Sequence, residues 1–386
     1  MVTITGKRTL TNAKRLIVKV GSSLLVSPTS LEYRQNWMNA LAQDIAKIRA
    51  GGCEVVLVSS GAVALGKQQY QPKTTRPKLE DIQALAAIGQ VRLAGAWAAA
   101  FAPFELSVGQ VLLTLDDTEN RRRWLNSSST LRALLQMSVV PLINENDSVA
   151  SDEIRYGDND RLAARTAQMV GADVLVLLSD VDGLYASDPC IHENARHLPL
   201  VEHITPKIEQ MAGGSAGALG SGGMVTKIMA ARIAGFAGCA TIIANGEPMS
   251  PLSALMAGAK NTLFLPQIKP AQARKNWIAG ALQPKGEITI DAGAAAALSK
   301  GASLLAAGIT KVDGNFERGE VVSIQGPNRI VLARGITSYD VAELQKIQGL
   351  QSDDIHLVLG YAARKAVIHR DNLMVMSEGN TDDAES

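Results

Sequence analysis

The sequence has few cysteines, few aromatic residues and no excess of either charge. Its 386 residues include 3 cysteines, Cys53, Cys190 and Cys239, which lie far apart. This odd, scattered set argues against a disulfide framework and favours a reduced, cytosolic compartment. The formal net charge is +1 and aromatic residues make up 4%. Neither a general attraction to nucleic acids or membranes nor a base-stacking platform is therefore expected.

Long apolar runs are also missing. The most apolar stretch, residues 82–101, is interrupted by Gln90 and Arg92, so we expect no membrane-spanning segment. The first 14 residues lack the apolar core of a secretory signal, and we expect a short polar arm there. Residues 374–386 are predicted to form a disordered acidic tail. The 46% of apolar residues is then available for a globular core.

Between residues 15 and 263, continuous runs of Val, Ile and Leu alternate with segments of helical spacing. Runs of this kind, rather than strict alternation, indicate strands that are buried on both faces. They predict an α/β domain with an open, mostly parallel sheet sandwiched by helices. The expected strands lie within 15–26, which contains a glycine turn, 53–66, which runs into a glycine turn, 107–114, 139–147, which ends in a polar loop, 173–185 and 240–246. The expected helices cover 31–50, 80–100, 123–138 and 160–172.

The composition and the predicted secondary structure change after residue 264. Three prolines in residues 264–284 indicate a linker. Short β-like runs follow over 285–373, including residues 355–361, with helix-like pieces near 293–300 and 340–348. The C-terminal part is therefore predicted to be a separate, small β-rich domain.

Polar residues and glycines gather at the ends of four predicted strands. Ligands of open α/β sheets bind beyond the carboxyl ends of the strands. The sequence therefore predicts one site at that edge of the sheet. Its residues are Lys19 and Gly21, Ser59 to Gly61, Asn144 to Asp147, and Ser179 to Asp182.

A glycine-rich segment, residues 214–235, reads GSAGALGSGGMVTKIMAARIAG. Free backbone N–H groups at the start of a helix favour phosphate binding, although the residue order is not that of a P-loop. A flexible connection between two helices is the plainer interpretation. Lys19 lies within an apolar strand, where its burial is costly without an anionic partner, unless its side chain extends to water. Together, Lys19 and Lys227 favour phosphoryl transfer, with Mg²⁺ on the phosphates.

A loop rich in acids and amides runs from residue 144 to 160. Asp147, Asp158, Asn159 and Asp160 could orient the lysines, hold Mg²⁺ or bind a cationic amine. Asp160 also suits the N-cap of the predicted helix 160–172. The EF-hand spacing is absent, and the scattered histidines match no standard zinc site. We therefore predict no protein-held metal directly.

The motifs VKVGSS, VSSGAVALG, INEND with GDND, and GGMVTK together resemble the amino acid kinase family. The resemblance extends over about residues 15–373 and is strongest to the branch that phosphorylates the γ-carboxylate of L-glutamate. It implies the amino acid kinase fold followed by a PUA domain, a small β-barrel. It further implies that ATP is the phosphoryl donor and γ-glutamyl phosphate the product, in the first step of proline biosynthesis, with proline as a feedback inhibitor. Implied partners are glutamyl phosphate reductase, through channelling, and further copies of the chain in a dimer or tetramer.

The resemblance also implies roles for individual residues. Lys19 and Lys227 would neutralise the transferred phosphoryl group, and Asp160, or else Asp158, would hold them in place. An acceptor carboxylate is ionised near pH 7, so no general base is required. The implied glutamate contacts are Ser60, Gly61, Asn144, Asp147, Asp158 and Asn159. The implied nucleotide contacts are Lys19, Gly21, Ser179, Asp180, Ser221, Gly222, Gly223, Met224, Val225, Thr226 and Lys227.

Three other functions are compatible with parts of the sequence. The acceptor could be acetylglutamate, aspartate or UMP, although GDND and the C-terminal domain favour glutamate. The C-terminal domain could bind RNA, which the near-neutral charge disfavours. The chain could also be an inactive sensor of amino acid and nucleotide, which the presence of both lysines disfavours.

Overall fold

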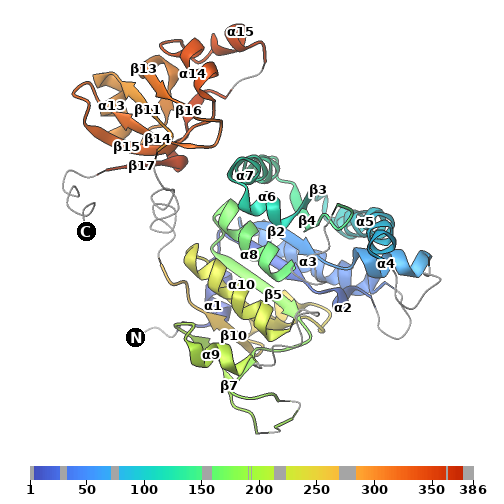
Figure 1. Cartoon of the computed structure of the whole chain (residues 1–386). Helices are drawn as coiled ribbons and strands as arrows, with labels where there is room; N and C mark the ends of the chain where they lie inside the picture. The colour runs from blue at the N-terminus through green and yellow to red at the C-terminus, as the bar shows by residue number, and fades with distance from the viewer. Residues whose placement is uncertain are drawn as a thin grey trace. The chain divides into compact units, whose positions relative to one another are not determined.

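The computed structural model describes residues 4–26, 33–70, 78–149, 159–189, 191–192, 194–212, 223–268, 284–361 and 364–376. The chain divides into two compact units, Met1–Pro270 and Ala271–Ser386, whose elements are labelled in Figure 1. The expected site residues Asp158, Ser221 and Gly222 lie outside the described residues, as does Cys190.

The first unit is built on an eight-stranded sheet. Neighbouring strands pair in parallel, except that β9 and β10 are antiparallel. The predicted open, mostly parallel sheet is thus confirmed. In the order in which they lie side by side, the strands are β3 (Val108–Leu113), β4 (Val140–Glu145), β2 (Glu54–Ser59), β1 (Arg15–Val20), β5 (Val174–Ser179), β9 (Ala240–Asn245), β10 (Asn261–Phe264) and β8 (Leu200–Val201).

Helices cover both faces of this sheet, as Figure 1 shows. On one face, α3 and α5 contact each other and α3 contacts α11; on the other, α8 contacts both α7 and α10. The remaining short elements are α1, α2, α6 and α9, the turn η1 (Ala102–Phe104), and the strands β6 (Leu184–Tyr185) and β7 (His197–Leu198). The helices are α1 (Gly6–Thr11), α2 (Ser22–Leu25), α3 (Gln35–Ala50), α4 (Ala62–Gln69), α5 (Leu79–Phe101), α6 (Leu115–Glu119), α7 (Arg121–Gln136), α8 (Asn159–Val170), α9 (Pro206–Met211), α10 (Met224–Phe236) and α11 (Pro251–Ala257).

The central strand β1 explains why the strand pattern is continuous. Val18 and Val20 are fully buried in one hydrophobic cluster with Trp37 of α3. Successive side chains of a strand point to opposite faces, so Ile17 and Lys19 face the other side, where α8 contacts β1. Both faces of β1 are covered, and Lys19 is directed toward α8.

The segment expected as a polar arm is partly folded. Thr5 accepts a hydrogen bond from the backbone of Arg8 and caps α1, in which Leu10 is buried. The helix contacts α11 and β10, and a Cβ at Gly6 would overlap the side chain of Asn261. Residues 5–12 are therefore an integral part of the first unit.

Helix α5 is the longest in the described part of the chain. With the turn that follows, it is the one described segment long and apolar enough to cross a membrane by length and composition, a test that core helices also pass. Here Leu85, Gly89 and Trp97 form part of a buried stripe. A Cβ at Gly89 would overlap the carbonyl oxygen of Ala62, so α4 and α5 meet backbone to backbone. In this unit α5 is a core helix.

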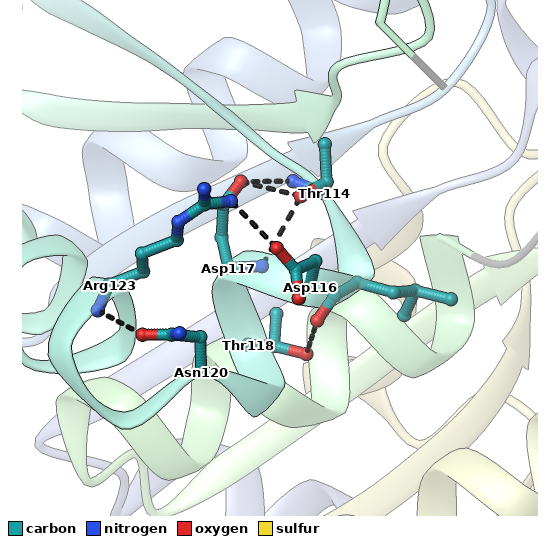
Figure 2. Close-up of polar contacts among 7 residues, drawn as sticks. Thr114, Asp116, Asp117, Thr118, Asn120 and Arg123 are labelled. Carbon is teal, nitrogen blue, oxygen red and sulfur yellow. Dashed lines mark hydrogen bonds and ion pairs between the residues drawn. The ribbon is translucent and has the colours of Figure 1, made fainter. Parts of the chain in front are cut away.

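A capped turn follows the edge strand β3, as Figure 2 shows. Thr114 caps α6, and the carboxylate of Asp117 accepts bonds of 2.7 Å from both its N–H and its hydroxyl. Asn120 caps α7 by accepting a bond from the N–H of Arg123, whose guanidinium lies 2.7 Å from Asp116. These contacts fix how the chain leaves the carboxyl end of β3.

The second unit has a five-stranded sheet and its own hydrophobic core. Residues 355–361, expected to be β-like, instead contain helix α15, which ends at Gly360 in the left-handed conformation. Strand β17 pairs with β15, so residues 374 and 375 belong to the sheet rather than to the expected tail. The sheet order is β13 (Ile309–Gly314), β11 (Gly286–Ile290), β14 (Val321–Gln325), β15 (Val331–Ile336) and β17 (Leu373–Val375); β12 (Leu304–Leu305) pairs with β16 (Ala366–Ile368), and the α-helices are α13 (Ala292–Ser299), α14 (Val341–Ile347) and α15 (Ile355–Leu359).

Candidate active site

Asp160 holds two lysines in a buried ion cluster at the carboxyl edge of the sheet. Lys19 Nζ lies 2.7 Å from Asp160 Oδ1, and Lys227 Nζ lies 3.4 Å from Oδ2. The hydroxyl of Thr226 donates to Oδ2 over 2.9 Å. Lys19, Asp160 and Lys227 are 5%, 0% and 3% exposed. The structure thus brings together three residues that are far apart in the sequence. Lys19 precedes Asp160 by 141 positions, and Asp160 precedes Lys227 by 67.

The local fold explains this convergence. Lys19 leaves β1 on the face that α8 covers, as described above. Asp160 is the second residue of α8, so it lies inside the first helical turn rather than before the helix as an N-cap. Lys227 is the fourth residue of α10, which contacts α8 directly. Two helix starts and one strand end therefore meet at the same point.

The three side chains of the cluster influence one another's ionisation. Burial alone would raise the pKa of Asp160, but the ammonium groups of Lys19 and Lys227 overcome this and hold it below its usual value. Burial lowers the pKa of Lys227; the charge of Asp160 opposes this shift, and that of Lys19 adds to it. Two buried ammonium groups that meet at one carboxylate place positive charge at this point of the sheet edge, which suits the approach of an anion.

Beside this cluster, the turn after β2 supplies a hydroxyl and a helix start. Asn159 Nδ2 donates to Ser60 Oγ over 2.8 Å, which links this turn to α8. Gly61 has φ 108° and forms the N-cap of α4, a conformation that favours glycine. The preceding residue, Ser59, accepts a 2.9 Å bond from Trp97 Nε1 of α5. The turn is thus held from two sides.

Asn144, at the end of β4, forms a second buried polar contact with α5. Its Nδ2 donates to Gln90 Oε1 over 2.8 Å. Three polar atoms here are buried and have no hydrogen-bond partner among the described residues: Asn144 Oδ1, Asn159 Oδ1 and Gln90 Nε2. Buried polar groups in native proteins are normally satisfied, so these atoms indicate a place for a polar ligand.

Asp147 lies in the turn after β4, two residues beyond the strand. Burial raises the pKa of its carboxyl group to about 6. A cationic partner would favour the ionised form and reverse this shift. Asp147 follows Asn144 by three residues, just beyond the same strand.

The other side of the cluster is built from β1, β5 and α10. Gly21 N donates to the carbonyl of Leu178 over 3.3 Å, so the turn after β1 stays beside β5. Ser179 Oγ accepts a 3.3 Å bond from Val181 N, and Asp180 is exposed but close enough to oppose the downward shift in the pKa of Lys227. This side offers hydroxyl, carboxylate and lysine groups.

The start of α10 adds backbone donors to the same side. Gly223 is the N-cap of this 13-residue helix, and Met224 and Val225 are in its first turn. Thr226 Oγ1 donates to the Gly223 carbonyl as well as to Asp160. The N–H groups at a helix start attract phosphate, and here they adjoin the buried lysine of the cluster.

Sequence reasoning missed Gln90 and Trp97 as site residues. In the sequence, Gln90 interrupts an apolar stretch, and this interruption is the available signal of a buried polar contact. An amide at a position that helical spacing places in the core needs a buried polar partner. The identity of that partner depends on how α5 packs.

Known protein families and a curated relative match this chain. The family model described as amino acid kinase family matches residues 14–245, and that of the PUA domain matches residues 286–359. A curated protein from Paramagnetospirillum magneticum named glutamate 5-kinase is 53% identical over 366 residues, or 95% of this chain and 99% of the relative. This chain belongs to the glutamate 5-kinase branch of the amino acid kinase family.

A second curated relative agrees with that assignment. A glutamate 5-kinase from Dinoroseobacter shibae is 52% identical over 367 residues, which cover 95% of this chain and 100% of the relative. Among solved structures, carbamate kinase from Giardia lamblia bound to AMP-PNP is 17% identical, with a TM-score of 0.48, over 66% of this chain and 99% of that one. The family resemblance of the sequence motifs is confirmed.

Proposed function

We propose that this chain transfers the γ-phosphoryl group of ATP to the γ-carboxylate of L-glutamate. A carboxylate oxygen forms the new bond to the γ-phosphorus, the bond from that phosphorus to the β,γ-bridging oxygen breaks, and ADP leaves. The product, γ-glutamyl phosphate, is that of the first step of proline biosynthesis. The buried Lys19–Asp160–Lys227 cluster, which brings two lysine side chains to one carboxylate, is the observation that carries this proposal.

In this reaction the two lysines neutralise the charge on the transferred group. Lys19 and Lys227 lie on either side of one carboxylate, so an oxyanion that joins the cluster meets both ammonium groups. Asp160 pairs with both of them in a site that water barely reaches. Since the acceptor carboxylate is already ionised, catalysis rests on positioning and electrostatic stabilisation.

The acceptor would bind on the side of β2 and β4. Asp147 and the oxygens of Asn144 and Asn159 would accept hydrogen bonds from the α-ammonium group of glutamate. The hydroxyl of Ser60 and the N–H groups after Gly61 would contact its carboxylate. These groups suit an amino acid better than UMP, whose phosphate would face the carboxylate of Asp147.

The nucleotide would bind on the side of β5 and α10. Gly223, Met224 and Val225 would offer N–H groups to its phosphates, with Ser179 and Asp180 on the other wall. Mg²⁺ would supply charge neutralisation of the β- and γ-phosphates. No cluster of three or more His, Cys, Asp or Glu able to hold a metal occurs among the described residues. A Mg²⁺ ion held mainly by nucleotide phosphates and water fits this donor set.

Formation of γ-glutamyl hydroxamate from L-glutamate, ATP, Mg²⁺ and hydroxylamine tests the proposal. We expect activity in the wild type, at least about a hundredfold loss in Lys227→Ala, and normal activity in the exposed control Lys47→Ala. Aspartate, acetylglutamate and UMP, each tested by ADP release, should be poor acceptors. Folded, ATP-binding protein that releases ADP with one of these but not with glutamate would replace glutamate as the substrate.

Proline inhibition belongs to the same proposal. Proline has the ammonium and carboxylate groups of the glutamate α-carbon, so Asp147 and its neighbours could bind it in place of glutamate. Hydroxamate formation should then fall with added proline and recover with added glutamate. Inhibition that added glutamate does not relieve would show that proline binds outside the glutamate site.

Self-association would involve α5. Its outward side exposes the small or apolar residues Ala84, Ala87, Val91, Gly95 and Ala98, and Val91 is 75% exposed. Such a stripe permits close contact with a second copy, as a dimer or tetramer. Light scattering of wild type and Ala98→Glu would test this, with a smaller particle expected for the variant.

Two further expectations complete the proposal. The free, buried thiols of Cys53 and Cys239 suit a reduced cytoplasmic compartment. The acyl phosphate product is reactive toward water, so direct transfer to glutamyl phosphate reductase would protect it. A coupled assay in which a competing excess of hydroxylamine fails to intercept the product would support channelling.

A further inference from the structure

Gln90 lies on the buried face of α5, between two parts of the acceptor side. It is 8% exposed. Its neighbour Gly89 packs against the carbonyl of Ala62, directly after the Ser60–Gly61 turn, while its own amide reaches Asn144 at the end of β4. Helix α5 therefore joins the ends of β2 and β4 through one residue pair.

The contact determines which atom Asn144 presents. An amide side chain has a donor end and an acceptor end. Because Gln90 Oε1 accepts from Asn144 Nδ2, the opposite end, Oδ1, is left as an unpartnered buried acceptor. The reverse orientation would direct an N–H₂ group toward the same space and would repel an ammonium group.

A packing role alone does not account for Gln90. Its Nε2 is buried and has no partner among the described residues, which is unfavourable relative to a satisfied group. An apolar side chain of similar size would avoid that cost. The oxygen of Gln90 thus contributes something that packing does not, namely the orientation of Asn144.

We propose that Gln90 is a positioning residue that makes the acceptor site selective for a substrate with an α-ammonium group. It acts through Asn144, whose Oδ1 it holds ready to accept a hydrogen bond from that group. This inference rests on the proposed function, since it makes Gln90 responsible for the preference for L-glutamate over a dicarboxylic acid of the same length that lacks the amine.

The test compares L-glutamate as substrate with glutarate, the same dicarboxylate without the ammonium group, as a competitive inhibitor. We expect Gln90→Met to raise the KM for L-glutamate about tenfold, because a change of this size corresponds to the loss of one hydrogen bond to a charged group. The inhibition constant of glutarate, the KM for ATP and kcat should change less than about twofold. The matched control is Gln136→Met, the same change at an exposed position of α7.

Two more variants show whether the effect passes through Asn144. In an Asn144→Ala background, Gln90→Met should add almost nothing, because the two residues act as a unit. Gln90→Glu keeps an oxygen for Asn144 Nδ2 and should retain most of the preference for glutamate over glutarate. The Glu variant also keeps the test decisive if Gln90→Met does not fold.

Several outcomes would overturn the inference. Equal weakening of glutamate and glutarate would assign Gln90 a packing role, and so would additive effects in the Asn144→Ala background. Loss of the glutamate preference in Gln90→Glu would exclude orientation through the oxygen. Wild-type protein that forms no hydroxamate from L-glutamate would overturn the proposed function, and this inference with it, whereas an active wild type with an unaffected Gln90→Met overturns this inference alone.

Discussion

Lys19 and Asp160 form a 2.7 Å ion pair between side chains that are 7% and 0% exposed. The pair joins the central strand to a helix that begins about 140 residues later in the chain, and it is one half of a cluster that Lys227 completes. Breaking a buried pair leaves an uncompensated charge, which costs more than the pair itself contributes. The cluster therefore links the stability of the first unit to the chemistry proposed for it.

Asp160→Asn tests this link. The variant leaves two buried ammonium groups without their carboxylate, so we expect a loss of about 3–5 kcal/mol in the free energy of unfolding. Hydroxamate formation should fall at least about a hundredfold. Urea unfolding and the hydroxamate assay measure the two effects, and Asp353→Asn, at an 87% exposed side chain, is the control. Normal activity in Asp160→Asn would show that the lysines need no carboxylate between them.

Asp147 predicts a pH dependence of glutamate binding. The pKa of its carboxyl group in the free protein is about 6. Below that pH the group is protonated and loses the charge that attracts the ammonium group of glutamate. The KM for glutamate should therefore rise as the pH falls from 7.5 to 5, approaching about tenfold per pH unit below 6, while the KM for ATP stays nearly constant.

Asp147→Asn serves as the matched variant in that experiment. It cannot gain or lose the proton, so its KM for glutamate should be high and nearly independent of pH over the same range. A variant whose KM still rises as the pH falls would assign the titration to another group.

The architecture could be predicted because β1, β2 and β5 are buried on both faces. Their apolar runs are unbroken for that reason, and such runs separated by helical segments have few alternatives to a covered parallel sheet. Helix α1 could not be predicted in the same way. Only Gly6 and Leu10 of its six residues are buried, which is too few to show a period.

Helix α15 was misassigned for a related reason. Ile355, Val358 and Leu359 form an apolar run that suits a strand as well as a helix. The deciding feature is Gly360, whose φ of 74° ends the helix in the left-handed conformation. Five helical residues are too short for periodicity to outweigh β propensity.

The candidate site also contains residues that could be predicted from the sequence and residues that could not. Lys19, Asp160 and Lys227 each belong to a local motif, so their positions could be proposed without the fold. The roles assigned to them stay predictions until the variants are measured. The pairing of Gln90 with Asn144 joins residues 54 positions apart and depends on the rotation of α5, which no local pattern specifies.

The crossing of α4 and α5 leads to a third prediction. Ala at position 89 would place a methyl group against the carbonyl of Ala62, so the helices must separate. Gly89→Ala should lower the free energy of unfolding by about 1–3 kcal/mol. It should also raise the KM for glutamate, because the Ser60–Gly61 turn and Gln90 both adjoin this crossing.

Gly95→Ala is the control on the same helix. A Cβ at Gly95 meets nothing within 4 Å, so only helix propensity acts, and stability should rise by up to about 1 kcal/mol. Urea unfolding of both variants gives the comparison. Equal stabilisation by the two changes would contradict the backbone contact between α4 and α5.

The final prediction concerns the N-terminal helix. Leu10 is 3% exposed, in one cluster with the core of the first unit, whereas Ile4 is 53% exposed. Leu10→Ala removes buried methyl groups and leaves a cavity, so the free energy of unfolding should fall by about 2–5 kcal/mol, while Ile4→Ala should change it by less than about 0.5 kcal/mol. Urea unfolding measures both. If α1 were an arm without a structural role, the two variants would be equally stable, and deletion of residues 1–12 would leave the unfolding transition unchanged. Because α1 contacts α11 and β10, we expect that deletion to lower the midpoint more than Leu10→Ala does.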